Sequence, residues 1–174
     1  MTKRKIILVP DEILKKKSEK IEKLTNKEKQ LADDLFETMY KNNGIGLAAV
    51  QVGVLRRMIV IDVSKKDEEK KPLCLINPVI KSFGKDRSTY EEGCLSIPET
   101  FIEIERPKTC IVEYVYISGN KKNMECDGLL STCVQHEINH LDGKLIIDFL
   151  SKLKKDILIK KLSKNKNTSS RVIV

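Results

Sequence analysis

The sequence predicts a single domain in which antiparallel strands are combined with three helices. Residues 101–117 are rich in β-branched and aromatic side chains, and they lead through a turn at 118–121 into a second β-rich run at 123–126. Apolar residues recur with helical spacing after residue 25, from 129 to 141, and again near the C-terminus. A chain of 174 residues without an internal repeat is long enough to bury one sizeable core.

The N-terminal part is expected to hold a short extended segment and one helix. Residues 5–9 are mostly apolar and extended, and a Pro-Asp turn follows them. Thr25 and Glu28 have the spacing of a capping box, and the following helix is expected to end at residues 42–44, Asn-Asn-Gly. The apolar residues that repeat every four positions on this helix are Leu31, Leu35 and Met39.

Two more strands are expected between residues 56 and 80. Residues 56–63 have the β-branched content of a strand, and the charged run 65–71 is typical of a solvated loop. Residues 73–80 form the next strand around Asn77 and Pro78. Because proline cannot donate a hydrogen bond to a neighbouring strand, Pro78 indicates a sheet edge or a break.

Both histidines of the chain lie in one short stretch, residues 135–143. On a helix, His136 and His140 are about 40° apart and one turn from each other, so both imidazoles can reach one metal ion. Glu137 is about 100° away from His136, where it could take a proton from a bound water. This is the HExxH pattern of metallohydrolases. The alternative is two partly exposed histidines beside a solvated glutamate, since a bare HExxH also occurs by chance.

The helix that carries this pattern is expected to have two different faces, and residues 127–128, Asp-Gly, open it. One face points to a pocket and the other to the core. The pocket face holds Leu129, Cys133, His136 and His140. The core face holds Leu130, Val134, Ile138 and Leu141. A short strand at 144–147 and a final helix over 148–164 follow. The final helix has one apolar stripe of Phe149, Leu150, Leu153 and Ile157.

Charge, cysteine content and hydropathy indicate the cell compartment of the chain, the state of its thiols and the kind of partner it has. The net charge is +8, but residues 152–174 contribute +7 of it through eight basic side chains and one acidic side chain. This local basicity indicates docking and says little about an active site. Five cysteines without a CxxC pair are expected to be reduced thiols. No apolar run approaches a membrane span or a secretory signal, so we expect a cytoplasmic chain with no membrane partner and with a flexible tail at 165–174.

A catalytic metal site of this kind needs a third protein ligand. No glutamate follows Glu137, and the position three residues beyond Gly143 is occupied by isoleucine, so the ligand is expected upstream. Cys94, in a turn beside a glycine, is the strongest candidate, and Cys133 on the pocket face is its rival. Upstream, the Gly-rich apolar segment 44–53 is interrupted by Gln51, an amide that either serves the site or only satisfies a backbone group.

Three separated segments match, in order and spacing, the three signature motifs of the peptide deformylase family. They are Gly-Ile-Gly-Leu-Ala-Ala-Val-Gln at 44–51, Glu-Gly-Cys-Leu-Ser at 92–96 and Gln-His-Glu-Ile-Asn-His at 135–140. The resemblance extends over residues 6–153. It implies an α+β fold in which antiparallel sheets pack around the HExxH helix, with an N-terminal and a C-terminal helix. Residues 1–164 would then form one catalytic domain.

The resemblance also implies a reaction and its metal. Cys94, His136 and His140 would bind a divalent ion, commonly Fe²⁺ in this family, with Zn²⁺, Ni²⁺ or Co²⁺ able to replace it. The reaction is hydrolysis of the formyl group from the N-terminal N-formylmethionine of nascent polypeptides, by attack of a metal-bound water assisted by Glu137. The catalytic residues implied beside Glu137 are Gln51 and the backbone N–H of Leu95, which would stabilise the oxyanion.

Further residues match the family's substrate-binding positions or depart from its pattern. The matching residues are Ile45, Gly46, Tyr90, Glu92, Gly93, Leu129, Thr132 and Cys133. Phe101 stands where relatives often carry an arginine near the far end of the substrate, which bears on sequence preference after methionine. The basic C-terminal helix resembles the segment with which some relatives dock on the ribosome, and an ordinary solvated helix is the alternative.

Two other functions fit these residues less well. A zinc endopeptidase is disfavoured because the downstream ligand of such enzymes is missing. A basic RNA- or ribosome-binding protein with a structural metal is disfavoured because a closed structural site needs four protein ligands, and a fourth is not evident.

Overall fold

The computed structural model describes residues 4–65 and 67–165. Within these ranges the chain forms three α-helices, three short 3₁₀ helices and seven strands. In chain order they are η1 (Glu12–Lys15), α1 (Asn26–Lys41), β1 (Gly46–Ala48), η2 (Ala49–Val52), β2 (Met58–Ile61), β3 (Leu73–Phe83), β4 (Arg87–Cys94), β5 (Ile97–Pro107), β6 (Thr109–Val115), β7 (Lys121–Asp127), α2 (Gly128–Leu141), η3 (Ile146–Phe149) and α3 (Lys152–Asn165).

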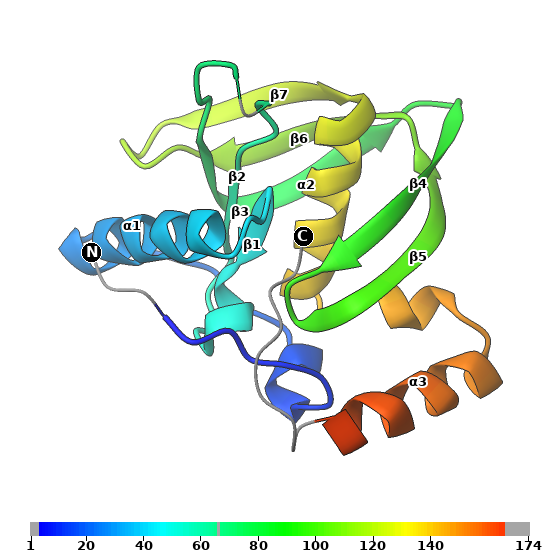
Figure 1. The fold of residues 1–174 in the computed structure, drawn as a ribbon. Coiled ribbons are helices and arrows are strands. Elements are labelled where there is room, and N and C mark those ends of the chain that lie inside the picture. The colour runs from blue at the N-terminus through cyan, green and yellow to red at the C-terminus, as the bar shows by residue number, and fades with distance from the viewer. Residues whose placement is uncertain (1–3, 66, 166–174) are drawn as a thin grey trace.

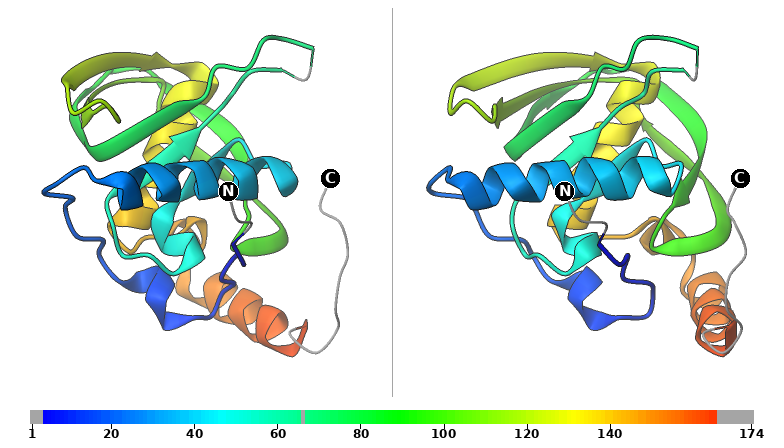
Figure 2. Two further views of the ribbon diagram at one scale, coloured as in Figure 1. Left: turned by 90° about the vertical axis from the view of Figure 1, so that its left-hand side faces the viewer. Right: turned by 60° about the vertical axis from the view of Figure 1, so that its left-hand side comes forward.

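The strands form two antiparallel sheets with α2 between them (Figure 1). The larger sheet has the order β1-β2-β3-β6-β7, and the smaller one is the β4-β5 hairpin. Helix α2 packs against strands of both sheets, while α1 packs against β1 and β2. Figure 2 shows α1 and α3 on the outside of the molecule. The expected α+β architecture around the HExxH helix is therefore the observed one.

Helix α1 begins and ends as the sequence predicts. The Thr25 hydroxyl accepts a hydrogen bond from the Lys27 N–H at 3.2 Å, and Glu28 accepts one from the Thr25 N–H at 2.8 Å. At the other end, Asn43 has a φ of 54°, which ends the helical path. The capping box thus fixes where α1 starts, and its buried face, centred on Leu35, covers β1 and β2.

The core face of α2 is also confirmed. Asp127 caps the helix by accepting a hydrogen bond from the Gly128 N–H at 2.6 Å. Val134, Ile138 and Leu141 are buried in a cluster with residues of the larger sheet. Burying one face of a helix determines the direction of its other face. These contacts therefore point the histidine side of α2 away from the larger sheet.

One local expectation is met in only one of its two forms, and a second one is wrong. Pro78 lies inside β3, which is an interior strand of the larger sheet, so it does not mark an edge. The expected break is present as a register shift against β6 between Ile76 and Val79. The strand expected at 144–147 is absent, because the Leu145 N–H donates to the Asp148 side chain at 2.7 Å and the chain turns into η3.

The C-terminal helix is shorter than predicted and is packed through a different face. It begins at Lys152, because residues 146–149 belong to η3 and Leu150 is extended. Phe149, Leu153 and Ile157 of the expected apolar stripe are exposed, whereas Leu158 and Leu162 pack against the body of the protein. The tail expected at 165–174 lies outside the described residues, apart from the end of α3.

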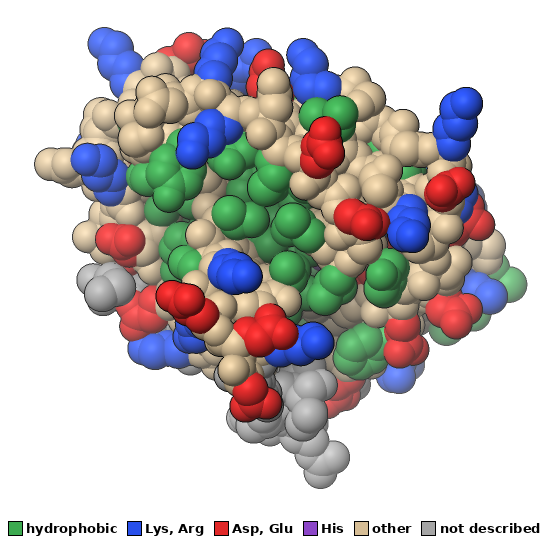
Figure 3. Space-filling view, turned by 90° about the horizontal axis from the view of Figure 1, so that it is seen from above, with side chains coloured by type: hydrophobic (Ala, Val, Ile, Leu, Met, Phe, Trp, Pro, Cys, Tyr) green, Lys and Arg blue, Asp and Glu red, His purple; other side chains and the backbone are tan. Residues whose placement is uncertain are grey.

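The described surface carries charges of both signs. Figure 3 shows hydrophobic side chains near the middle of one face, with acidic and basic side chains interspersed around them. No helix within the described ranges combines the length and apolar character needed to cross a membrane.

A matched pair of leucine substitutions tests the packing of the helices. Replacing Leu35, which is 0% exposed in α1, by alanine is expected to lower the free energy of unfolding by about 2–5 kcal/mol. The same change at Leu153, which is 71% exposed in α3, should alter it by less than about 0.5 kcal/mol. Urea unfolding measures both values, and equal effects would contradict the assignment of the two helix faces.

Candidate metal centre and active site

Three potential metal ligands converge between the β4-β5 hairpin and α2. The Cys94 Sγ and one nitrogen of each of His136 and His140 all lie within 4.8 Å of one another. Cys94 Sγ is 3.3 Å from the His140 Nε2. A thiolate and an imidazole bound to one tetrahedral ion are separated by roughly 3.5 Å, given usual metal–ligand lengths. The three side chains therefore fit a single divalent ion.

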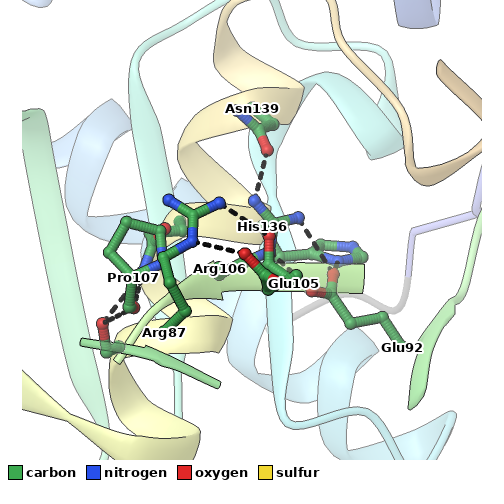
Figure 4. Close-up of polar contacts among 9 residues, drawn as sticks. Arg87, Glu92, Glu105, Arg106, Pro107, His136 and Asn139 are labelled. Carbon is green, nitrogen blue, oxygen red and sulfur yellow. Dashed lines mark hydrogen bonds and ion pairs between the residues drawn. The ribbon is translucent and has the colours of Figure 1, made fainter. Parts of the chain in front are cut away.

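A buried chain of polar contacts orients His136 (Figure 4). Its Nδ1 lies 2.8 Å from a carboxylate oxygen of Glu92, so this nitrogen is engaged and Nε2 is left for a metal. Arg106 donates to both oxygens of Glu92, at 2.5 and 3.0 Å, and to the Asn139 side chain at 2.8 Å. The carboxylate–histidine pair is the usual device that fixes the tautomer of a metal ligand.

Glu92 is ionised in this arrangement. Burial raises the pKa of Glu92, but hydrogen bonds from His136 and Arg106 outweigh burial and bring that pKa below its usual value. Both the carboxylate and the Arg106 guanidinium are buried, with side-chain exposures of 4% and 5%. The two hydrogen bonds between the guanidinium and the carboxylate offset the cost of removing both charges from water.

Glu137 is buried beside the cluster and is held over the backbone of Gly46. A Cβ atom at position 46 would lie 2.8 Å from the Cys133 Sγ and would collide with the Glu137 Oε1, so only glycine fits there. The Glu137 Oε2 has no hydrogen-bond partner among the described residues. Burial raises the pKa of Glu137 to about 7, and Glu92 acts in the same direction. Such a carboxylate is suited to accept and return a proton near neutral pH.

Gln51 satisfies a backbone group and also faces the segment that carries Cys94. Its Oε1 accepts a hydrogen bond from the Ala48 N–H at 2.8 Å, which satisfies a backbone group. Its Nε2 donates to the Ser96 hydroxyl at 3.1 Å and lies 3.7 Å from the Cys94 Sγ. The amide is therefore locked by η2 and presents its N–H side to the hairpin that carries Cys94.

A cavity of about 270 Å³ opens beside these residues. It is lined by every residue that the resemblance placed in substrate binding, namely Ile45, Gly46, Tyr90, Glu92, Gly93, Leu129, Thr132 and Cys133. Gln51, Cys94, Leu95, His136 and Glu137 also line it. His140 is 1% exposed and lies behind this wall. Glu92 contributes to the wall, and both of its carboxylate oxygens are engaged by Arg106 or His136.

Cys133, the rival ligand, points elsewhere. Its Sγ donates to the Ile45 carbonyl at 3.7 Å. Burial raises the pKa of this thiol well above its usual value, and Cys133 is not among the three residues whose donor atoms converge. Cys133 is therefore a wall residue of the cavity.

Arg106 and Asn139 were missed by sequence reasoning. The signal for Arg106 was present, because Ile102, Ile104 and Arg106 alternate along β5 and all three are buried. An arginine on the inward face of a strand needs a buried partner. Here the partners come from β4 and α2.

The fold and the convergence of Cys94, His136 and His140 beside the buried Glu137 carboxylate are typical of metal-dependent hydrolases. The sequence profile described as Polypeptide deformylase matches residues 3–156. The peptide deformylase of Pelagibacter ubique is 50% identical over 174 residues, covering 100% of both chains, and that of Agrobacterium fabrum is 52% identical over 164 residues, covering 94% of this chain and 96% of its own. The crystal structure of peptide deformylase from Ehrlichia chaffeensis superposes with a TM-score of 0.91 at 40% identity, covering 96% of this chain and 98% of the other.

The chain belongs to the polypeptide deformylase family. The activity of this family is the metal-dependent hydrolysis that removes the formyl group from N-formylmethionine at the start of nascent polypeptides.

Proposed function

We propose that Cys94, His136 and His140 hold the catalytic metal ion and that Glu137 moves the proton during deformylation. The observation that carries this proposal is the convergence of the three donor atoms within 4.8 Å beside the unpartnered carboxylate oxygen of Glu137. When bound, the ion supplies Lewis-acid activation of water and of the formyl carbonyl. Family resemblance supports Fe²⁺ as the native ion, and a thiolate with two imidazoles also suits Zn²⁺, Ni²⁺ or Co²⁺.

Glu137 acts first as a base and then as an acid. Its free Oε2 accepts the proton of the attacking water and afterwards delivers it to the amine nitrogen of methionine, whose bond to the formyl carbon breaks. The low exposure of this carboxylate excludes bulk water, which would otherwise compete for the proton. The products are formate and a peptide with a free amino terminus.

Gln51 and Leu95 stabilise the oxygen of the formyl group as it gains charge. The Gln51 amide is held on both of its polar atoms before substrate arrives, so its N–H group needs little reorganisation. The backbone N–H of Leu95, which follows Cys94 in the hairpin, supplies the second donor. Loss of one such donor typically costs about 3 kcal/mol of transition-state stabilisation.

The methionine side chain binds in the apolar part of the cavity. Ile45 and Leu129 line the cavity and remain 42% and 43% exposed, so a substrate side chain can cover them. Each CH₂ group buried there contributes about 0.8 kcal/mol. Phe101 lies at the same cavity with its ring over Gly93, where it offers an aromatic surface to residues that follow methionine.

In this proposal, residues 1–164 form a single catalytic domain that works in the cytoplasm. The C-terminal helix of this domain supplies a docking surface. Helix α3 is rich in lysine and leaves Leu153 and Ile157 exposed. Lysines can neutralise RNA phosphates, which supports docking on the ribosome, where nascent chains emerge. A lysine-rich helix that is only solvated is the alternative.

Formate release from formyl-Met-Ala-Ser tests the proposed function. Protein purified without oxygen and loaded with Fe²⁺ is expected to release formate, and Ni²⁺, Co²⁺ and Zn²⁺ forms are compared in parallel. Acetyl-Met-Ala-Ser serves as the matched control and should remain intact. No formate with any of these metals, or cleavage at an internal peptide bond, would contradict the proposal.

A further inference from the structure

Phe149 covers the buried polar chain that orients His136. The Arg106 Cζ lies 5.0 Å from the centre of the Phe149 ring, within the range of a cation–π contact. Arg106 is only 5% exposed, whereas Phe149 is 49% exposed. The ring therefore stands between the guanidinium and solvent at the end of the chain formed by Arg106, Glu92 and His136.

The position of Phe149 is set by the segment that precedes α3. Phe149 is the last residue of η3, and the Asp148 side chain closes this turn by accepting a hydrogen bond from the Leu145 N–H at 2.7 Å. Lys155 of α3 forms an ion pair with the same carboxylate. These two contacts fix the η3 turn and join it to α3, while η3 itself packs against β4 and β5 of the hairpin.

We infer that Phe149 is a positioning residue for the metal centre, acting through Arg106 and Glu92. With the ring in place, the Arg106–Glu92 ion pair lies in a medium of low polarity, where its Coulomb attraction is strong. Without the ring, water reaches the guanidinium and weakens its hold on Glu92. Glu92 then orients the His136 ring less firmly, and outer-shell partners of this kind commonly change metal affinity. This inference rests on the proposed ligand set.

The rate of metal loss to a chelator tests this inference without relying on activity. Phe149→Ala is expected to lose bound Co²⁺ or Zn²⁺ about three- to tenfold faster than the wild type. Phe149→Tyr keeps the aromatic face and should restore the rate to within about twofold. Leu153→Ala removes another exposed apolar side chain near the C-terminus and should leave the rate unchanged.

A double substitution shows whether the effect passes through Arg106. If it does, adding Phe149→Ala to Arg106→Ala should produce no further acceleration of metal loss. Metal loss from Phe149→Ala at the wild-type rate, or equal acceleration by Leu153→Ala, would overturn the inference and leave the proposed ligand set standing. A wild-type protein that retains no metal under the same conditions would overturn the ligand set and the inference together.

Discussion

Replacing Glu137 by glutamine is expected to lower kcat for formate release about 10²- to 10⁴-fold while the metal content stays at the wild-type level. Glutamine has the same shape as glutamate, so it fits the tight space over Gly46. It cannot accept the proton of the attacking water, because an amide oxygen is a far weaker base than a carboxylate. Formate release under single-turnover conditions and metal analysis of the same sample measure the two quantities.

The matched control for this substitution is Glu91→Gln. Glu91 also lines the cavity, but it is exposed and lies outside the cluster of Cys94, His136 and His140. The same loss of charge at Glu91 is expected to change kcat by less than about threefold, because solvent screens the charge of an exposed carboxylate. If Glu137→Gln kept its kcat, or lost metal in proportion to its activity, the role of Glu137 as the proton carrier would be refuted.

The part of the site that lies on α2 could be predicted from the sequence because its geometry is local. His136 and His140 are one helical turn apart, and the regular rotation of a helix places them on one side. The apolar residues of the opposite face, such as Val134 and Leu141, show which side is buried. Helix α1 was predictable for the same reason, since its capping box lies within four consecutive residues.

The rest of the site depends on contacts between distant segments. Cys94 meets His140 across 46 positions of sequence, and the periodicity around Cys94 does not encode that contact. The family resemblance was needed to choose Cys94 over Cys133. The motif around Glu92 does not reveal its contact with Arg106 either, because Arg106 lies on the neighbouring strand β5.

The C-terminal segment shows how a side chain can override a local pattern. The apolar residues at 145–147 read as a short strand, yet Asp148 competes for the Leu145 N–H and closes a 3₁₀ turn. That turn moves the start of α3 to Lys152 and leaves Phe149 outside the helix, beside Arg106. Periodicity alone could not reveal this, because the turn depends on one hydrogen bond and not on a repeating pattern.

Replacing Cys94 by serine is expected to weaken metal binding by at least about 100-fold, more than the loss of a typical outer-shell partner. A serine hydroxyl is a much poorer ligand than a thiolate and stays protonated near neutral pH. Replacing Cys133 by serine should change the affinity by less than about threefold, because its buried thiol contacts the Ile45 carbonyl and is held in its neutral form. Competition with a chelator of known affinity measures both values.

The absorption of the Co²⁺ forms separates ligand loss from a general loosening of the site. A cobalt–thiolate bond gives a charge-transfer band in the near ultraviolet, which should vanish in Cys94→Ser and persist in Cys133→Ser. General loosening would weaken the band in both variants, since both cysteines line the cavity. Equal losses of affinity, or a band that survives in Cys94→Ser, would mean that the third ligand is a different residue. The distances around Cys94 argue against that outcome, because its Sγ is already 3.3 Å from the His140 Nε2.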